Sequence, residues 1–470
     1  LTEKAQEAAR NVVKIINNSA DALKVILRNL KVDAGNTKEN AVTVSGTGDV
    51  TLELDGKNEL KGGSEYKSDG YYYRGGDGLN STELRRTLTI QDETKDGSLT
   101  AIGGSVEGAG FEYGPRDPSA LIGGSGIRAK NLNSSNVTIQ AEGGDSTVNN
   151  SRITASGGSG ITSQYGTNKL SNTNITAKGG SGYSSGNSGK AQGGSGVSLV
   201  GSSTIENTSI TATGGNAEST GNNGEAWSGG AAGFSPFNHE KDSLDVKNST
   251  LDLFGCHTKA KGSYYVTGTL HTGTGFGSRS LKDLTITVRE STGEGGSKGR
   301  EDYILGGSVR VGGDSTVNLI GNYLRSKLTL EENAVANLYT PEGKKTEHTT
   351  WEDKIVVSGN GGVYTYEDAK VTENKDGTVT VEGTLTGLKK AEHNYNVKSV
   401  TKATCDTAGK IVYECTDEGC TDTYEETIDA LGHEFVNGVC TRCGAPEQAA
   451  AENGGSSAVT LTVTGAGAYE

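Results

Sequence analysis

The sequence predicts an all-β fold, a right-handed parallel β-helix (β-solenoid) with an N-terminal capping helix and a small C-terminal Cys-rich β module. Of 470 residues, 72 are Gly and only 32% are hydrophobic, whereas a compact globule of this size is normally richer in apolar residues. Short β-branched segments separated by Gly doublets recur at a regular interval, which is typical of stacked repeats. A right-handed crossover is the default for parallel strands.

The Gly doublets define the repeat. A doublet followed by a small residue, Gly and an apolar residue begins at Gly123, Gly157 and Gly193, and a looser copy begins at Gly229, so that the starts lie 34, 36 and 36 residues apart. A second strand in each repeat ends in another doublet, at 139–144, 175–180 and 210–215. This agreement over several positions predicts one structural unit per repeat.

Each recurrent residue type has an expected role. Gly supplies a positive φ at sharp corners between strands. Asn precedes the second strand by three positions, and it tolerates the left-handed region and can form a ladder between repeats; it occurs at Asn136, Asn172, Asn207 and Asn248. Inward positions such as Ile139 and Ala141 would form a narrow core, while Thr176 and Thr211 would point outward as a Thr stripe.

The flanking segments differ from the repeats. Residues 1–20 are expected to form the capping helix, because apolar residues recur there at helical spacing; they are Ala5, Ala8, Ala9, Val12, Val13, Ile15 and Ile16. The other predicted regions are the parallel β-helix at 21–340, terminal β-coils or a small β module at 341–390, the Cys-rich module at 391–446, and a linker with the start of a further strand at 447–470.

The charge and hydropathy exclude several classes of partner. The formal net charge is −14, and an acidic surface repels phosphate backbones and anionic lipid, so nucleic acid is not an expected partner. No apolar run approaches the ~20 residues that span a bilayer, so membrane insertion is not expected. No signal peptide or initial Met is visible, and we therefore expect a mature or truncated chain.

Five of the six cysteines lie between residues 405 and 443. Two pairs of thiolates, Cys415 with Cys420 and Cys440 with Cys443, match the spacing of structural zinc sites. His433 and His393 could substitute as ligands. Disulfides in an oxidising compartment, including a Cys405–Cys415 bridge across a hairpin, are an alternative, and free thiols are another. A site with four thiolate ligands would be structural, because it leaves no open position for catalysis.

The C-terminal cysteines and their surroundings resemble a known class of module. The segment from Ala403 through Cys415, Leu431-Gly432-His433 and Val439 to Gly444 resembles Cys-rich, zinc-ribbon-like modules of large secreted proteins of Gram-positive anaerobic bacteria. In those modules a C-x-x-C pair stands where this chain has Cys415 and Cys420 more widely spaced. The Gly-rich repeats are similar to β-helical, carbohydrate-binding-domain-like adhesins of the same surface proteins. The resemblance implies a secreted or extracellular, cell-surface location.

A few aromatic residues are candidates for binding glycans, since exposed rings stack against sugar faces. They are Tyr71, Tyr72, Tyr73, Trp227, Phe234 and Tyr264. Hydrophobic contacts that anchor loops onto the column explain the same residues. The variable Gly/Ser/Asn tracts between repeats could line a binding edge or act as solvated spacers.

Carboxylates and Gly-Gly-Asp segments give weaker signals. Asp92, Glu93 and Asp96 could serve a polysaccharide-degrading enzyme, yet such clusters do not recur at the repeat spacing and favour a solvated surface. Gly-Gly-Asp occurs at Asp77 and Asp145 without a nonapeptide period, so calcium is not expected.

The predicted function is thus a secreted or cell-surface bacterial adhesin or glycan-binding protein, not an enzyme. Its expected partners are host or environmental glycans or surface glycoproteins. A structural stalk or filament subunit that associates end to end is the alternative, and a polysaccharide-degrading β-helix enzyme is the second alternative.

Overall fold

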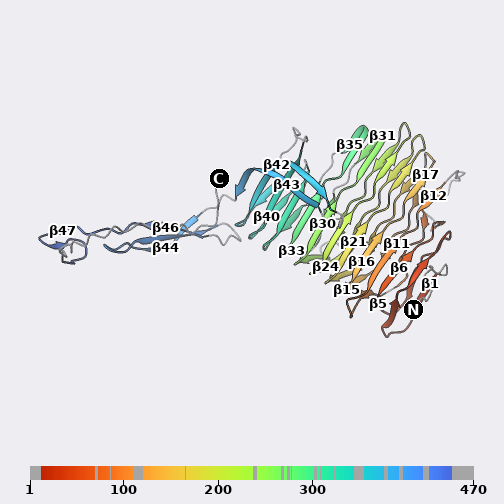
Figure 1. Ribbon diagram of the computed structural model, residues 1–470, viewed down its shortest axis with the longest axis horizontal. Helices are drawn as coiled ribbons and strands as arrows, with labels where there is room; N and C mark the ends of the chain where they lie inside the picture. Colours follow the sequence, from red (N-terminus) through yellow and green to blue (C-terminus); the bar gives the residue numbers. More distant parts are fainter. Residues whose placement is uncertain are drawn as a thin grey trace. The chain divides into compact units, whose positions relative to one another are not determined.

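The computed structural model shows an all-β chain (Figure 1). It describes residues 12–68, 72–84, 86–108, 120–164, 166–236, 241–265, 269–272, 276, 278–300, 304–306, 308–321, 324, 326–342, 354–374, 379–390, 395–416 and 423–446. None of these residues is helical, and so none belongs to a helix that could cross a membrane. The chain divides into two units, the larger comprising Leu1–Glu392 with Asp417–Thr421 and the smaller His393–Thr416 with Asp422–Glu470.

Three large sheets make up most of the larger unit. The first has 16 strands: β1 (Val13–Asn17), β2 (Leu23–Arg28), β4 (Val42–Gly46), β5 (Val50–Asp55), β9 (Leu79–Ser81), β10 (Leu88–Gln91), β14 (Ile127–Ala129), β15 (Leu132–Ser135), β19 (Ile161–Ser163), β20 (Gly166–Ser171), β24 (Val197–Glu206), β28 (Ala232–Ser235), β29 (Ser243–Lys247), β32 (Leu270–Thr272), β33 (Ser278–Lys282) and β36 (Leu305–Gly306).

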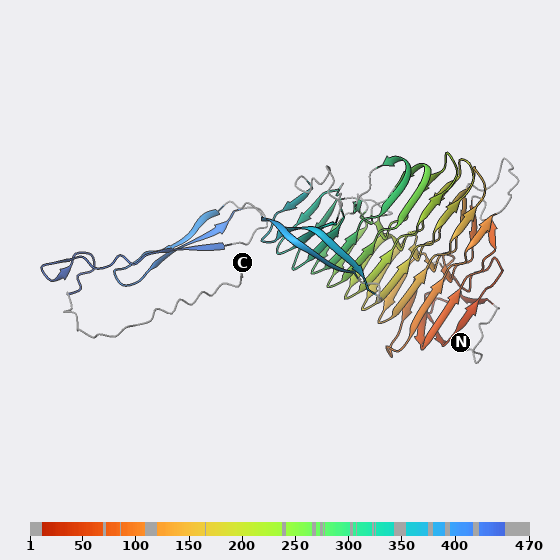
Figure 2. The ribbon, with the colours of Figure 1, turned by 45° about the horizontal axis from the view of Figure 1, so that its top comes forward.

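The second sheet has 12 strands: β3 (Lys31–Asp33), β6 (Lys57–Lys61), β11 (Ser98–Ile102), β16 (Thr138–Glu142), β21 (Asn174–Lys178), β25 (Ser209–Thr213), β30 (Thr250–Phe254), β34 (Thr285–Arg289), β38 (Thr316–Ile320), β40 (Val335–Pro341), β42 (Gly362–Glu373) and β43 (Val379–Lys390). Figure 2 shows the long antiparallel β42–β43 pair at the end of this sheet.

The third sheet also has 12 strands: β7 (Tyr66–Ser68), β8 (Tyr72–Gly75), β12 (Val106–Gly108), β13 (Ala120–Ile122), β17 (Ser146–Val148), β18 (Thr154–Ser156), β22 (Gly182–Ser184), β23 (Lys190–Gln192), β26 (Ala217–Ser219), β27 (Glu225–Trp227), β31 (His257–Tyr265) and β35 (Thr292–Arg300). A small parallel sheet joins β37 (Val309–Val311), β39 (Leu328–Leu330) and β41 (Ile355–Val357).

Successive repeats pair in parallel with equivalent residues opposite one another. Ile139 of β16 is the register partner of Ile175 in β21, which is in turn the partner of Ile210 in β25. These side chains are buried, at 1% exposure or less, and they belong to a core shared by the first and second sheets. The Gly doublets therefore identify parallel-paired repeats correctly.

The predicted fold class is nevertheless wrong as stated. The expectation was one right-handed β-helix around one narrow column, whereas the strands form several parallel sheets and a right-handed β-helix is not shown. In the third sheet the long strand β31 joins two rows of short strands, because its first part pairs with β26 and its last part with β27. Its inward side chains form small apolar clusters of their own, separate from the main core.

The predicted N-terminal helix is also wrong. Residues 1–11 lie outside the described residues, and Val13–Asn17 form β1, which pairs in parallel with β4. Ile15 is buried while Ile16 is 61% exposed, so the side chains alternate with the period of a strand. β-Branched residues favour this extended conformation once a neighbouring strand is available, and that partner lies far away in sequence.

The Gly doublets form a continuous hydrogen-bonded seam of backbone. In each doublet the second Gly donates its N–H to the carbonyl of the preceding doublet: Gly158 to Gly144, Gly144 to Gly124 and Gly124 to Gly104. A Cβ atom at Gly158 would overlap the carbonyl oxygen of Gly124. None of the glycines in the doublets between Gly103 and Gly215 has a positive φ, so close backbone approach, and not the expected corner conformation, requires Gly here.

The Asn residues do adopt the predicted left-handed conformation, with φ of 54° at Asn136 and 49° at Asn172. In two later repeats, the residue that follows the Asn carries a buried hydroxyl, which accepts a hydrogen bond from the preceding repeat. The N–H of Thr173 donates to Thr208 Oγ1 over 3.5 Å, and the N–H of Thr208 donates to Ser249 Oγ over 3.1 Å. These bonds satisfy amides beside the turn that would otherwise be buried without a partner.

The smaller unit contains two small antiparallel sheets. The first joins β44 (Tyr395–Thr401), β45 (Gly409–Cys415) and β46 (Thr423–Ile428), and the second pairs β47 (Phe435–Val436) with β48 (Val439–Cys440). Among the described residues of this unit, only the side chains of Cys405 and Cys440 are buried. A hydrophobic core is therefore not what holds this part of the chain together.

Candidate metal centre and candidate binding surface

Four side chains of the smaller unit converge on one point. The ligand atoms of Cys405, His433, Cys440 and Cys443 all lie within 4.8 Å of one another. The Sγ atoms of Cys405 and Cys440 are 3.9 Å apart, and Cys443 Sγ is 3.5 Å from His433 Nδ1. Thiolate and imidazole ligands at zinc distances give a tetrahedron with edges of about 3.6 to 3.8 Å. The group could hold a metal ion.

A tight hairpin positions the C-x-x-C pair. Asn437 and Gly438 join β47 to β48, and both have positive φ, 54° and 73°, which is the type I′ turn that Asn-Gly favours. After β48, the N–H of Gly444 donates to the carbonyl of Cys440 over 2.9 Å, and Gly444 itself has φ 75°. This turn brings Cys443 back beside Cys440.

The loop that carries Cys405 is joined to the segment before His433. The N–H of Leu431 donates to the carbonyl of Thr404 over 2.8 Å, and the N–H of Gly432 donates to that of Cys405 over 3.1 Å. The imidazole of His433 stacks on Phe435, with ring centroids 5.3 Å apart. Two segments remote in sequence are thus fixed against each other at the cluster.

Asp406 orients the histidine. Its Oδ1 lies 2.7 Å from His433 Nε2, so an Nε2–H that donates to this carboxylate leaves the Nδ1 lone pair facing the cysteines. Metal-bound histidines commonly have such a partner on the other ring nitrogen. Without an ion the same hydrogen bond to Asp406 raises the pKa of His433 to about 9, so a metal would compete with a proton for this ring.

The thiols are electrostatically unequal. Burial opposes ionisation of Cys440, but the backbone N–H groups of Cys443, Arg442 and Glu434 lower the pKa of its thiol to about 5. Burial, with the neighbouring Cys443 and Cys440, raises the pKa of Cys405 to about 12. Cys440 is therefore prepared as a thiolate, whereas ionised Cys405 needs a cation beside it.

Two of the four predicted metal ligands, Cys440 and Cys443, lie in the cluster, and so does His433, one of the two predicted substitute ligands. Cys415 lies at the end of β45, opposite Tyr395 in the sheet, while Cys420 and the substitute ligand His393 lie outside the described residues. The described cysteines, Cys405 among them, form no disulfide. Cys405 was not expected as a metal ligand, because it is not part of a closely spaced pair of cysteines in the sequence. It becomes a ligand candidate only through its position beside His433, Cys440 and Cys443 in the structure.

Among the predicted glycan-binding residues, Trp227 has the most distinctive surroundings. Its ring stacks on Tyr265 with centroids 5.2 Å apart and planes 9° apart. Lys190 Nζ lies 5.3 Å from the Trp227 centroid and pairs with Glu225 at 3.1 Å. These residues lie on neighbouring strands β23, β27 and β31, where the buried Ala191 and Ala226 alternate with them and face inward.

The other predicted aromatic residues are spread over several environments. Tyr72 is 41% exposed, whereas Tyr73 packs against a small cluster of the third sheet, with its ring 5.0 Å from that of Tyr66. Phe234 is buried in the main core at 2% exposure, so its ring anchors the repeat and does not face a ligand. Tyr264 packs against an alanine cluster, and Tyr71 lies outside the described residues.

No protein-family model, no curated protein and no solved structure matches this chain.

Proposed function

We propose that the protein is a secreted or cell-surface glycan-binding protein of the adhesin type, in which parallel sheets display a binding surface and a structural zinc ion stabilises the C-terminal unit. The observation that supports binding is the Trp227–Tyr265 pair with Lys190, presented on the outer face of the third sheet. Aromatic rings next to hydrogen-bonding side chains are what sugar recognition uses.

Zinc suits the four-residue cluster. Three sulfur ligands and one imidazole form a common structural zinc set, and four protein ligands leave no open position for a substrate. A small unit whose only buried described side chains are two of those ligands needs such a cross-link to fold. The zinc therefore has a structural role in this proposal, and glycan binding belongs to the sheets.

The test of the binding function is a glycan array probed with the full chain, the Trp227→Ala variant and the Tyr72→Ala variant. We expect binding to at least one glycan class and a loss of about 10-fold or more for Trp227→Ala, as for a central aromatic contact. Tyr339→Ala is the matched control, because it removes one ring from a similar stacked pair, Tyr339–Tyr366, on the second sheet.

Two other results would contradict glycan binding as the function. Absence of binding to every glycan, together with end-to-end chains in electron micrographs, would favour a stalk or filament subunit over a binding protein. Release of reducing or unsaturated sugars from a polysaccharide would favour an enzyme.

A further inference from the structure

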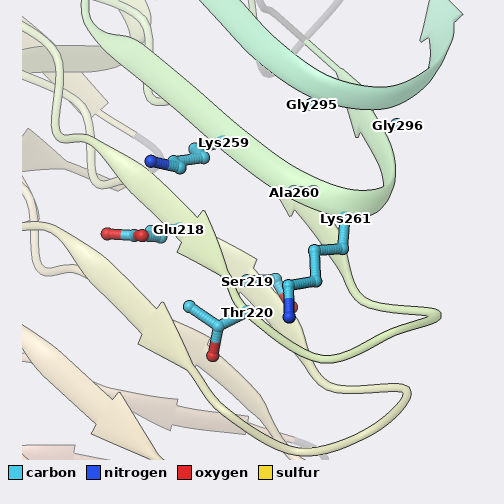
Figure 3. Close-up of a pocket in the computed structure, with 8 residues that line it drawn as sticks. All are labelled: Glu218, Ser219, Thr220, Lys259, Ala260, Lys261, Gly295 and Gly296. Atoms are coloured by element: carbon cyan, nitrogen blue, oxygen red, sulfur yellow. The ribbon is translucent and has the colours of Figure 1, made fainter.

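A pocket opens on the third sheet where β26, β31 and β35 lie side by side (Figure 3). Its volume is about 290 Å³, close to the lower end of small-ligand sites. Ser219, Ala260 and Gly295 are register partners on the three strands, and their backbones form its floor. Gly295 and Gly296 also line the pocket. A Cβ atom at either position would overlap a backbone carbonyl of β31, so glycine is required for the close approach of the two strands at this wall.

The two walls carry different chemistry. Glu218 and its register partner Lys259 lie on one side, while Thr220 and Lys261 lie on the other (Figure 3). Lys259 and Lys261 are exposed and alternate with the buried Ala260, so both point away from the interior. On the preceding strand β22, the register partner of Glu218 is Tyr183, a ring that is 37% exposed.

The two lysines differ in how their charge is balanced. Lys259 Nζ lies 3.0 Å from Glu294 Oε1, and Glu218 adds a second negative charge nearby. Lys261 makes no ion pair with any residue that the structure describes, and it lies with Thr220 on the exposed face of the sheet, opposite the buried side chain of Ser219. Among the described residues that line the pocket, Lys261 is therefore a cation available to an anionic group, and Thr220 on the same wall offers a hydroxyl.

We propose that this pocket binds an anionic saccharide, with a carboxylate or sulfate on Lys261 and Thr220 and a sugar ring over the glycine floor. This inference rests on the proposed glycan-binding function and names the class of glycan. The chain's net charge of −14 does not oppose it, because exposed charges beyond about 8 Å are screened at physiological ionic strength. A charge-assisted hydrogen bond at short range then dominates.

The experiment measures binding of 3′-sialyllactose, 3′-sulfolactose and lactose to the full chain by calorimetry. We expect 3′-sialyllactose, which carries a carboxylate, or 3′-sulfolactose, which carries a sulfate, to bind more tightly than neutral lactose. The tighter ligand of the two identifies the anionic group that the pocket prefers. Lys261→Ala should weaken acidic-sugar binding about 10- to 100-fold, the value of a charged hydrogen bond, and Thr220→Val about 2- to 10-fold. Lys178→Ala, an exposed lysine on the second sheet, is the matched control.

Two results would overturn the inference, and they can be told apart. If glycans bind in a Trp227-dependent manner but Lys261→Ala changes nothing, or lactose binds as well as its acidic derivatives, the pocket assignment fails and the proposed function stands. If neither these sugars nor any array glycan binds, the proposed function fails and takes the inference with it.

Discussion

The two units of this chain achieve order by different physical means. The larger unit stacks repeats so that each buries its neighbour's apolar side chains, as Ile139, Ile175 and Ile210 do in one column. The described part of the smaller unit buries only the side chains of Cys405 and Cys440. Stability is therefore distributed over many similar contacts in the first case. In the second case we expect it to depend on four side chains that could hold a metal ion.

The difference predicts how each unit responds to damage. A stack loses about the energy of one contact when one residue changes, because neighbouring repeats keep their own contacts. A metal-held unit loses its whole cross-link when one ligand or the ion is removed.

Removal of the metal should unfold the smaller unit and leave the larger one intact. Structural zinc contributes about 10 to 16 kcal/mol of apparent binding energy in small zinc modules, which is as large as the whole stability of a typical domain. We expect about one zinc per purified chain, as a four-ligand site requires. A strong chelator should make residues 395–446 sensitive to proteolysis, while the circular dichroism of the sheets stays nearly unchanged.

Single cysteine variants separate the two possible ligand sets. Cys440→Ser should abolish zinc binding, because its thiolate is the one that backbone N–H groups stabilise. Cys415→Ser is the control and should keep its zinc, since Cys415 lies in β45 beside Tyr395 and not in the cluster. Equal loss of zinc in both variants would return the site to the pairing of Cys415 and Cys420 with the C-x-x-C pair.

A methyl group in the glycine seam should give the largest single-residue effect in the larger unit. Gly158→Ala places a Cβ against the carbonyl of Gly124 in a backbone that cannot shift without breaking the seam. We expect a loss of about 2 to 3 kcal/mol, as for overpacking of a closed interior. The measurement is the free energy of unfolding in guanidinium chloride.

Gly233→Ala is the matched control for the seam. Gly233 lies in β28 of the same unit, and no atom lies within 4 Å of a Cβ built there. Its substitution should change the free energy of unfolding by less than about 1 kcal/mol, in the stabilising direction, because Ala restricts the unfolded chain. If both variants were equally stable, the seam would not be what makes the doublets necessary.

The parallel pairing of the repeats could be predicted from sequence, because the same residues recur in every repeat. The Gly doublets and the Asn residues recur, so their common register could be inferred even though the doublets' physical role, close approach and not positive φ, was misjudged. The N-terminal helix failed for the opposite reason. The segment that contains Ile15 and Ile16 is not repeated in the sequence, and its strand partner β4 lies in a different segment. The prediction therefore rested on local periodicity alone.

The metal centre shows the same limit. Cys440 and Cys443 are separated by two residues, a spacing that predicts metal ligands, and His433 could be named as a substitute ligand. Cys405 joins the cluster only through the hydrogen bonds that Leu431 and Gly432 make to its loop. No spacing rule specifies a ligand that tertiary contacts supply. One of the two separate clusters of the third sheet was missed for a similar reason, since it consists of alanines, which leave little hydrophobic signal.

The smallest effect concerns Asp92, a buried carboxylate in the turn between β10 and β11, 1% exposed. It accepts N–H bonds from Thr94, Lys95 and Gly97. Burial alone would raise the pKa of Asp92, but the Gly97 N–H, the Thr94 hydroxyl and the other amides together lower it. Asp92→Asn should cost about 1 to 2 kcal/mol at neutral pH, because an amide NH₂ then faces a backbone donor.

The pH dependence of that cost has a definite sign. A carboxylate whose pKa is lowered in the folded state stabilises the fold fully above its unfolded pKa of about 3.9, and the contribution disappears as the pH falls through the lower folded value. The gap between wild type and Asp92→Asn in urea unfolding should therefore narrow with acidification. Asp96→Asn, an exposed neighbour, should stay within about 0.5 kcal/mol of wild type throughout. A gap that does not change with pH would mean that Asp92 contributes by packing alone. The backbone amides of Thr94, Lys95 and Gly97 would then not be what stabilises this buried carboxylate.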